Sequence, residues 1–137
     1  MDWKEMFITG VVFVLGFSIG GTFSDIDLAP PLPIRHRSAW THGPFIPLAL
    51  WAASSGGLWW AYFALGFLPA YAIHLIYDMF PKKWTGGARV SWYPLTGWRM
   101  GGLLSFLFLA GSAALAGWMT YTLATGEFAN LRIAFLG

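Results

Sequence analysis

Three long apolar stretches, separated by two polar segments, dominate the chain. They run over residues 6–23, 45–80 and 100–123. The first and third have about the 20 residues that a helix needs to cross a bilayer. The middle stretch would be about 54 Å long as a single helix, whereas the hydrocarbon core of a membrane is roughly 30 Å thick. We therefore expect the middle stretch to break.

The break is predicted at Ser54-Ser55-Gly56-Gly57, because small polar residues and glycines interrupt helices. The break would leave a short helix that begins at Pro44, followed along the chain by a full spanning helix. A ten-residue helix covers about half of a membrane, so the two helices should form a hairpin that leaves one membrane face and returns to it. The pattern thus predicts an all-α, integral membrane helical bundle, a single domain over residues 1–137, with spanning helices at 6–23, 58–80 and 100–123 and a short helix at 44–53.

Small residues recur in the first and last of these spans. In lipid, such residues allow a neighbouring helix to approach closely. We expect both spans to carry a close-packing face, formed by Gly10, Gly16, Gly20 and Gly21 in the first and by Gly101, Gly102, Gly111, Ala113, Ala114 and Gly117 in the last.

The composition agrees with a membrane class and excludes others. Hydrophobic residues make up 57% and aromatic residues 19% of the 137 residues, which leaves too little polar surface to cover a soluble domain. The net charge is only +2, and no basic stripe points to nucleic acid as a partner. There is no cysteine, so no thiolate can bind a metal. Asp2 and Glu5 offset Lys4, so the first span lacks the basic start of a signal peptide and should be retained.

Basic side chains predict the orientation. By the positive-inside rule the polar segments should face the cytoplasm and both termini should face outward. The basic residues of the polar segments are Arg35, Arg37, Lys82, Lys83, Arg89 and Arg99, against Lys4 and Arg132 near the termini.

All three histidines and three of the four aspartates lie in two short polar patches that this topology brings to one membrane face. His74 and Asp78 are four residues apart, so on a helix they share a face. Asp25 and Asp27 follow the first span, where an extended backbone would aim both carboxylates the same way. His36 and His42 complete the first patch.

Imidazole and carboxylate ligands together suit a divalent metal, with zinc favoured and manganese or iron as alternatives. The patches offer more ligands than one tetrahedral zinc needs, so a two-metal site is open. A divalent cation activates bound water and polarises the oxygen of an ester or phosphoester, so such a site predicts hydrolysis. Asp27 is then a candidate general base, and Arg35 or Arg37 a group that holds a phosphate.

The order of these residues resembles the YdjM-like family of small membrane proteins. The resemblance covers about residues 10–94 and rests on Asp25-Ile26-Asp27, His36-Arg37, Thr41-His42, His74 with Asp78, and Trp84-Thr85-Gly86. It implies a metal-dependent hydrolase of the bacterial inner membrane, and some members are described as LexA-binding. Ser24 and Gly43 stand where the family usually has proline and serine. The metal ligands that the resemblance implies are Asp25, Asp27, His42, His74 and Asp78, with Asp27, His36 and Arg37 as the catalytic candidates.

Two rival functions remain open at this point. The chain could be a noncatalytic membrane subunit or adaptor, in which a protein partner packs on the small-residue faces and the His/Asp group holds a structural ion. It could also be a transporter or channel, although no ladder of charges crosses a span. The lipid bilayer is the partner common to all three functions, and a lipid or phosphoester substrate belongs to the first.

Overall fold

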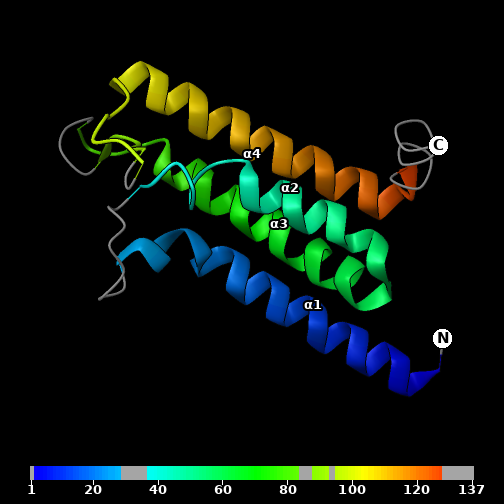
Figure 1. Ribbon diagram of the computed structural model, residues 1–137. Coiled ribbons are helices and arrows are strands. Elements are labelled where there is room, and N and C mark those ends of the chain that lie inside the picture. The colour runs from blue at the N-terminus through cyan, green and yellow to red at the C-terminus, as the bar shows by residue number, and fades with distance from the viewer. Residues whose placement is uncertain (1, 29–36, 84–87, 93–94, 128–137) are drawn as a thin grey trace.

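The computed structural model describes residues 2–28, 37–83, 88–92 and 95–127, and within them the protein is an all-α helical bundle (Figure 1). The predicted fold class is thus confirmed. The sequence also predicts a short amphipathic tail over residues 125–137, and most of this segment lies outside the described residues. The elements are α1 (Trp3–Phe23), the 3₁₀ turn η1 (Ser24–Leu28), α2 (Phe45–Ala53), the 3₁₀ turn η2 (Ser54–Gly56), α3 (Leu58–Asp78) and α4 (Gly102–Thr125).

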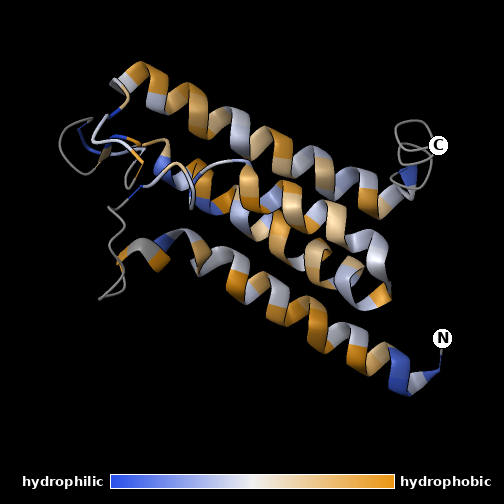
Figure 2. Ribbon diagram, in the orientation of Figure 1, coloured by the Kyte–Doolittle hydropathy of each residue, from blue (hydrophilic) through white to orange (hydrophobic). Residues whose placement is uncertain are grey.

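Three of the helices are long and apolar enough to cross a membrane. The spans contain 24, 21 and 24 residues, at Trp3–Ile26, Leu58–Asp78 and Gly102–Thr125. The helices are apolar along most of their length, and polar residues gather toward the ends of the bundle (Figure 2). The start of α1 and the end of α4 lie at one end, and the segments with the polar patches lie at the other (Figure 1).

The break in the middle apolar stretch lies where the sequence predicts it. α2 ends at Ala53, and η2 leads to Gly57, whose φ of 146° is open to glycine but not to residues with a Cβ. α3 then runs to Asp78 and ends two residues earlier than predicted. The following Pro81 disfavours helical dihedrals at Phe80, which accounts for the earlier end.

α1 and α3 run parallel and pack through glycine. A Cβ atom at Gly16 or Gly20 would overlap the backbone carbonyl of Phe63 or Phe67, and one at Gly66 would overlap that of Phe13. The predicted close-packing face of α1 is therefore confirmed at Gly16 and Gly20, four residues apart.

Glycines at several other predicted positions do not lie against a neighbouring helix. A Cβ atom added at Gly10 would meet no neighbouring heavy atom within 4 Å, and the same holds for Gly111 and Gly117 of α4. α4 packs through the buried Leu109, Ala113, Ala116 and Met119, whose spacing of three or four residues forms a single stripe. Of the small residues predicted to form the packing face of α4, Ala113 lies in this stripe, whereas Gly111 and Gly117 do not meet a neighbour.

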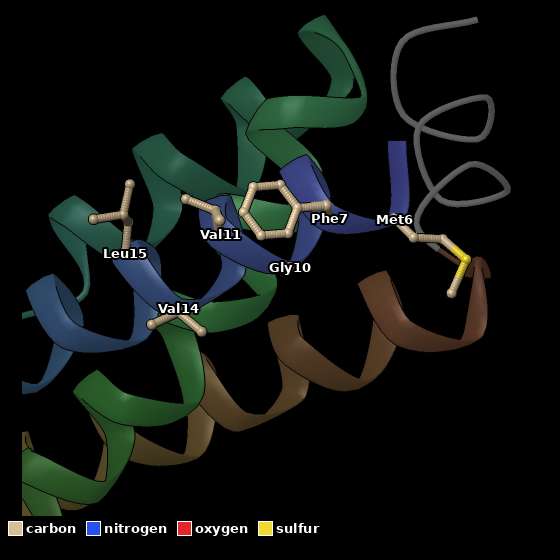
Figure 3. Close-up of a pocket in the computed structure, with 6 residues that line it drawn as sticks. All are labelled: Met6, Phe7, Gly10, Val11, Val14 and Leu15. Carbon is tan, nitrogen blue, oxygen red and sulfur yellow. The ribbon is translucent and has the colours of Figure 1, made fainter. Parts of the chain in front are cut away.

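Gly10 lies in a shallow hollow on the outer face of α1 (Figure 3). The missing side chain at Gly10 leaves the space, and every residue around it is apolar. Such a surface is compatible with lipid chains. The hollow is lined by Met6, Phe7, Gly10, Val11, Val14 and Leu15.

The chain before α2 folds into the bundle as a buried segment, which we call the inserted loop (residues 37–44). The hydroxyl of Tyr71 lies 2.9 Å from the carbonyl oxygen of Thr41 and 2.8 Å from that of Gly43. Tyr71 is seven residues before the end of α3, or about 10 Å along the helix, so the loop reaches well inside the bundle. Non-helical backbone at membrane depth needs partners within the protein, and Tyr71 supplies one.

Backbone hydrogen bonds also tie the inserted loop to the segment before α4. The amide of Ala39 donates to Ser91 at 2.8 Å, and the amide of Ser91 donates to Arg37 at 3.0 Å. Met100 in turn donates to Val90 at 2.9 Å. The polar end of the bundle is therefore closed by three short non-helical segments joined by isolated bridges.

Candidate metal centre

Three side chains that could hold a metal ion meet at the polar end of the bundle. His42 comes from the inserted loop, whereas His74 and Asp78 come from the last turns of α3. One ligand atom from each lies within 4.8 Å of the other two. The side chain of His42 is fully buried, and the other two are 16% exposed.

The contact that Nδ1 of His74 makes determines which nitrogen of the ring carries the proton. Nδ1 of His74 lies 2.9 Å from the carbonyl oxygen of Gly21, near the end of α1. A carbonyl only accepts, so Nδ1 donates, and the neutral ring then carries a lone pair at Nε2. This is the arrangement in which a histidine usually binds a metal, with the second nitrogen held by a carbonyl.

His42 has the same arrangement on different partners. Its Nδ1 lies 2.9 Å from the hydroxyl oxygen of Thr41, and that hydroxyl lies 3.2 Å from the carbonyl oxygen of Ser38. If the hydroxyl donates to Ser38, its oxygen accepts from Nδ1 of His42. The lone pair of His42 is then at Nε2, on the side of Asp78.

Three acceptor atoms consequently converge. Nε2 of His42 lies 3.0 Å from Oδ2 of Asp78, and Nε2 of His74 lies 3.5 Å from the same oxygen. Nε2 of His74 and Oδ2 of Asp78 are buried and form no hydrogen bond of acceptable geometry. Lone pairs that face one another repel, so a cation is needed between them, either protons on the imidazoles or a metal ion.

The three ligand atoms lie within 4.8 Å of one another, and two of their separations are close to those around a zinc ion. Ligand atoms bound tetrahedrally at about 2.0 to 2.1 Å lie about 3.3 Å apart, and the observed 3.0 and 3.5 Å lie on either side of this value. Three protein ligands would leave a fourth position for water or substrate, as in catalytic zinc sites. The group formed by His42, His74 and Asp78 could therefore bind a metal ion.

Arg37 holds the other oxygen of Asp78. Its Nη2 donates to Oδ1 at 2.8 Å, and its Nη1 donates to the carbonyl oxygens of Asp78 and Ala88 at 3.0 and 2.9 Å. Arg37 is only 8% exposed. The guanidinium is thus a partner of Asp78 and of the end of α3.

Asp25 lies beside this group rather than within it. Its Oδ1 is 3.7 Å from Nε2 of His74, and its side chain is 47% exposed. The backbone at Asp25 and Asp27 forms the turn η1, so the predicted extended conformation is wrong. The helical path of α1 continues past Phe23 in tighter 3₁₀ form and leaves no extended residues there.

Three of the predicted site residues are not fully described. The side chain of Asp27 and the whole of His36 and Arg35 lie outside the described residues. Of the five predicted metal ligands, the structure brings His42, His74 and Asp78 together and places Asp25 next to them.

Sequence reasoning missed Tyr71, which supports the loop that carries His42. Its position relative to His74 and Asp78 gives a signal, because residues at i, i+3 and i+7 share one face of a helix. Tyr71 is fully buried, and its ring stacks on that of Phe67 at a centroid distance of 5.7 Å.

Tyr71→Phe tests this support. The variant keeps the ring but removes the hydroxyl that serves two buried carbonyls, so we expect a loss of about 1–3 kcal/mol in the free energy of unfolding. Metal affinity should fall with it, since His42 follows Thr41 directly. Thermal unfolding and metal titration of the purified protein measure both effects. Tyr121→Phe, at a residue 55% exposed on α4, is the matched control and should leave both values unchanged.

The fold and the site together define a membrane-spanning helical protein with a His/His/Asp group that could bind a metal ion. The chain matches no protein-family model, no curated protein and no solved structure.

Proposed function

We propose that the protein is a membrane-embedded, metal-dependent hydrolase with its ion on His42, His74 and Asp78. The observation that carries this proposal is the convergence of three buried ligand atoms. In addition, Nδ1 of each imidazole is held by a hydrogen-bonding partner, which leaves Nε2 to face the ion. The resemblance to the YdjM-like family supports it as well. Zinc is the favoured ion, because two imidazoles and one carboxylate form a common catalytic zinc set.

The ion would supply two functions in hydrolysis. It would polarise the carbonyl or phosphoryl oxygen of the substrate and make a bound water molecule a stronger nucleophile. Asp25, half-exposed and 3.7 Å from His74, lies where a general base could take the proton of that water. Asp27 and His36 stay predictions for the same chemistry.

The position of the site supports a lipid as the substrate class. His74 and Asp78 belong to the last two turns of a spanning helix, so the ion would lie near the headgroup level. An ester or phosphoester of a membrane lipid presents its scissile bond at that depth. The basic residues at this end favour a site on the cytoplasmic side. The bacterial inner membrane, as the location of the protein, rests on the resemblance to the YdjM-like family.

A lipid hydrolysis assay tests the function. We expect zinc-loaded protein in liposomes to cleave one member of a panel of ester and phosphoester lipids, and to lose this activity with a chelator and regain it with zinc. His42→Ala should lower the rate at least about 100-fold, because one of three ligands is lost. Asp2→Asn, at the opposite end of the bundle, should retain full activity.

Two outcomes would contradict the proposal. One is cleavage that survives both metal removal and His42→Ala. The other is a tightly bound ion with four protein ligands and no exchangeable water, together with no cleavage of any lipid, which would instead indicate the noncatalytic subunit.

A further inference from the structure

We propose that Arg37 is a positioning residue, whose guanidinium orients the carboxylate of Asp78 so that Oδ2 faces the two histidines. This inference rests on the proposed metal site. It gives Arg37 a role distinct from the predicted one of holding a substrate phosphate.

The contacts of Arg37 restrain Asp78 at two points. Nη2 donates to the side-chain Oδ1, and Nη1 donates to the backbone carbonyl of the same residue. Rotation of the carboxylate would break the first contact, so Oδ1 is committed to Arg37 and Oδ2 is left for the cation. Partners of this kind, which hold a ligand in one orientation, typically change metal affinity by about 10- to 100-fold when removed.

Arg37 also joins the parts of the chain that carry the ligands. Its backbone carbonyl accepts the amide of Ser91, and its Nη1 donates to Ala88 in the same short segment. His42 follows five residues later in the inserted loop. One residue thus links the loop that supplies His42 with the helix that supplies Asp78.

The conformation and burial of Arg37 both carry a free-energy cost. Its φ of 57° is the one positive value at a non-glycine residue in the described ranges, and such a conformation costs about 1–2 kcal/mol. Its Nε is buried without an acceptor, which adds a desolvation cost. An arginine that only capped the end of α3 would need neither the positive φ nor the buried Nε. The two costs are therefore consistent with a role at the neighbouring metal site.

The geometry favours positioning over substrate binding. Both Nη atoms already donate to described acceptors, and Nε is buried. A phosphate would have to displace Asp78 from the guanidinium, and the displacement would release the metal ligand.

A double-mutant cycle in cobalt binding tests the proposal. Full-length protein is purified in detergent, freed of metal and titrated with Co²⁺, whose visible spectrum reports ligand geometry. We expect Arg37→Gln to weaken binding about 10- to 100-fold and to change the spectrum. Asp78→Asn should weaken binding further, and the double variant should bind no more weakly than Asp78→Asn alone, because Arg37 acts through Asp78.

Two further variants sharpen the experiment. Arg37→Lys should fall between wild type and Arg37→Gln, because an ammonium keeps the charge but lacks the planar fork that reaches the side chain and the backbone of Asp78 together. Lys83→Gln removes the same charge from an exposed position and should bind Co²⁺ like wild type. If Arg37→Gln does not fold, the comparison of Arg37→Lys with wild type decides by the same readouts.

The outcomes separate this inference from the proposed hydrolase. Unchanged affinity and spectrum in the Arg37 variants, or full additivity in the cycle, would overturn the positioning role. If the wild-type protein binds Co²⁺ and the Arg37 variants bind it more weakly, but no lipid is cleaved, the proposed hydrolase is overturned and the positioning role of Arg37 stands. Wild type that binds no Co²⁺ would overturn both.

Discussion

Asp78→Asn is expected to weaken metal binding so far that the purified protein retains no zinc. Oδ2 of Asp78 lies 3.0 and 3.5 Å from the two histidine nitrogens, so it is the centre of the ligand group. The amide removes the negative charge and, in either orientation, presents a weaker ligand or an N–H group to the ion. The fall in zinc affinity should exceed about 100-fold, the upper end for the loss of an outer partner.

Metal content per protein after purification, followed by zinc titration, measures this effect. Asp2→Asn is the matched control, since asparagine caps a helix as well as aspartate does and Asp2 lies at the other end of the bundle. Asp78→Asn also leaves the buried Arg37 without its ion-pair partner, so its stability must be compared as well. His74→Gln, which keeps Arg37 paired, should lose metal too. Zinc bound one-to-one by both variants would rule out this ligand group.

Gly20→Ala is expected to separate α1 from α3. The new Cβ would overlap the backbone carbonyl of Phe67, and backbone atoms of a packed helix cannot give way as a flexible side chain can. We expect the free energy of unfolding to fall by about 1–3 kcal/mol. Metal affinity should fall too, because the adjacent Gly21 carbonyl holds His74.

Gly10→Ala makes the same substitution on the same helix in open space. It should leave stability unchanged or raise it by about 0.5–1 kcal/mol, since alanine is the better helix former. Thermal unfolding in one detergent compares the two variants with wild type. Equal unfolding temperatures for all three would show that α1 and α3 do not need this contact.

The helices were largely predictable from the sequence because hydropathy and bilayer thickness constrain them tightly. The residues at which the helices begin and end were less predictable. α1 begins at Trp3 rather than at residue 6, because Asp2 and Glu5 form a capping box whose two hydrogen bonds measure 2.8 and 3.1 Å. Polar residues lower the hydropathy of that turn, although the spacing of Asp2 and Glu5 is itself a helix-start signal.

The site was predictable only in part. His74 and Asp78 follow from their spacing of four on a helix, and the hairpin brings His42 to them. The turn η1 was not predictable, because no residue type marks a helix that continues in 3₁₀ form. The pairing of Arg37 with Asp78 joins residues 41 apart in sequence, and no local pattern encodes such a contact.

The shortness of α2 has a consequence for how the protein enters the membrane. With nine residues it is about 14 Å long, too short to be held in a bilayer alone. It must therefore enter together with α3 as a pair. His42 precedes α2 in the chain, and its partners lie at the far end of α3, so a nascent chain that stops before Asp78 has no ion-binding group. The centre is completed only once the whole hairpin is in place.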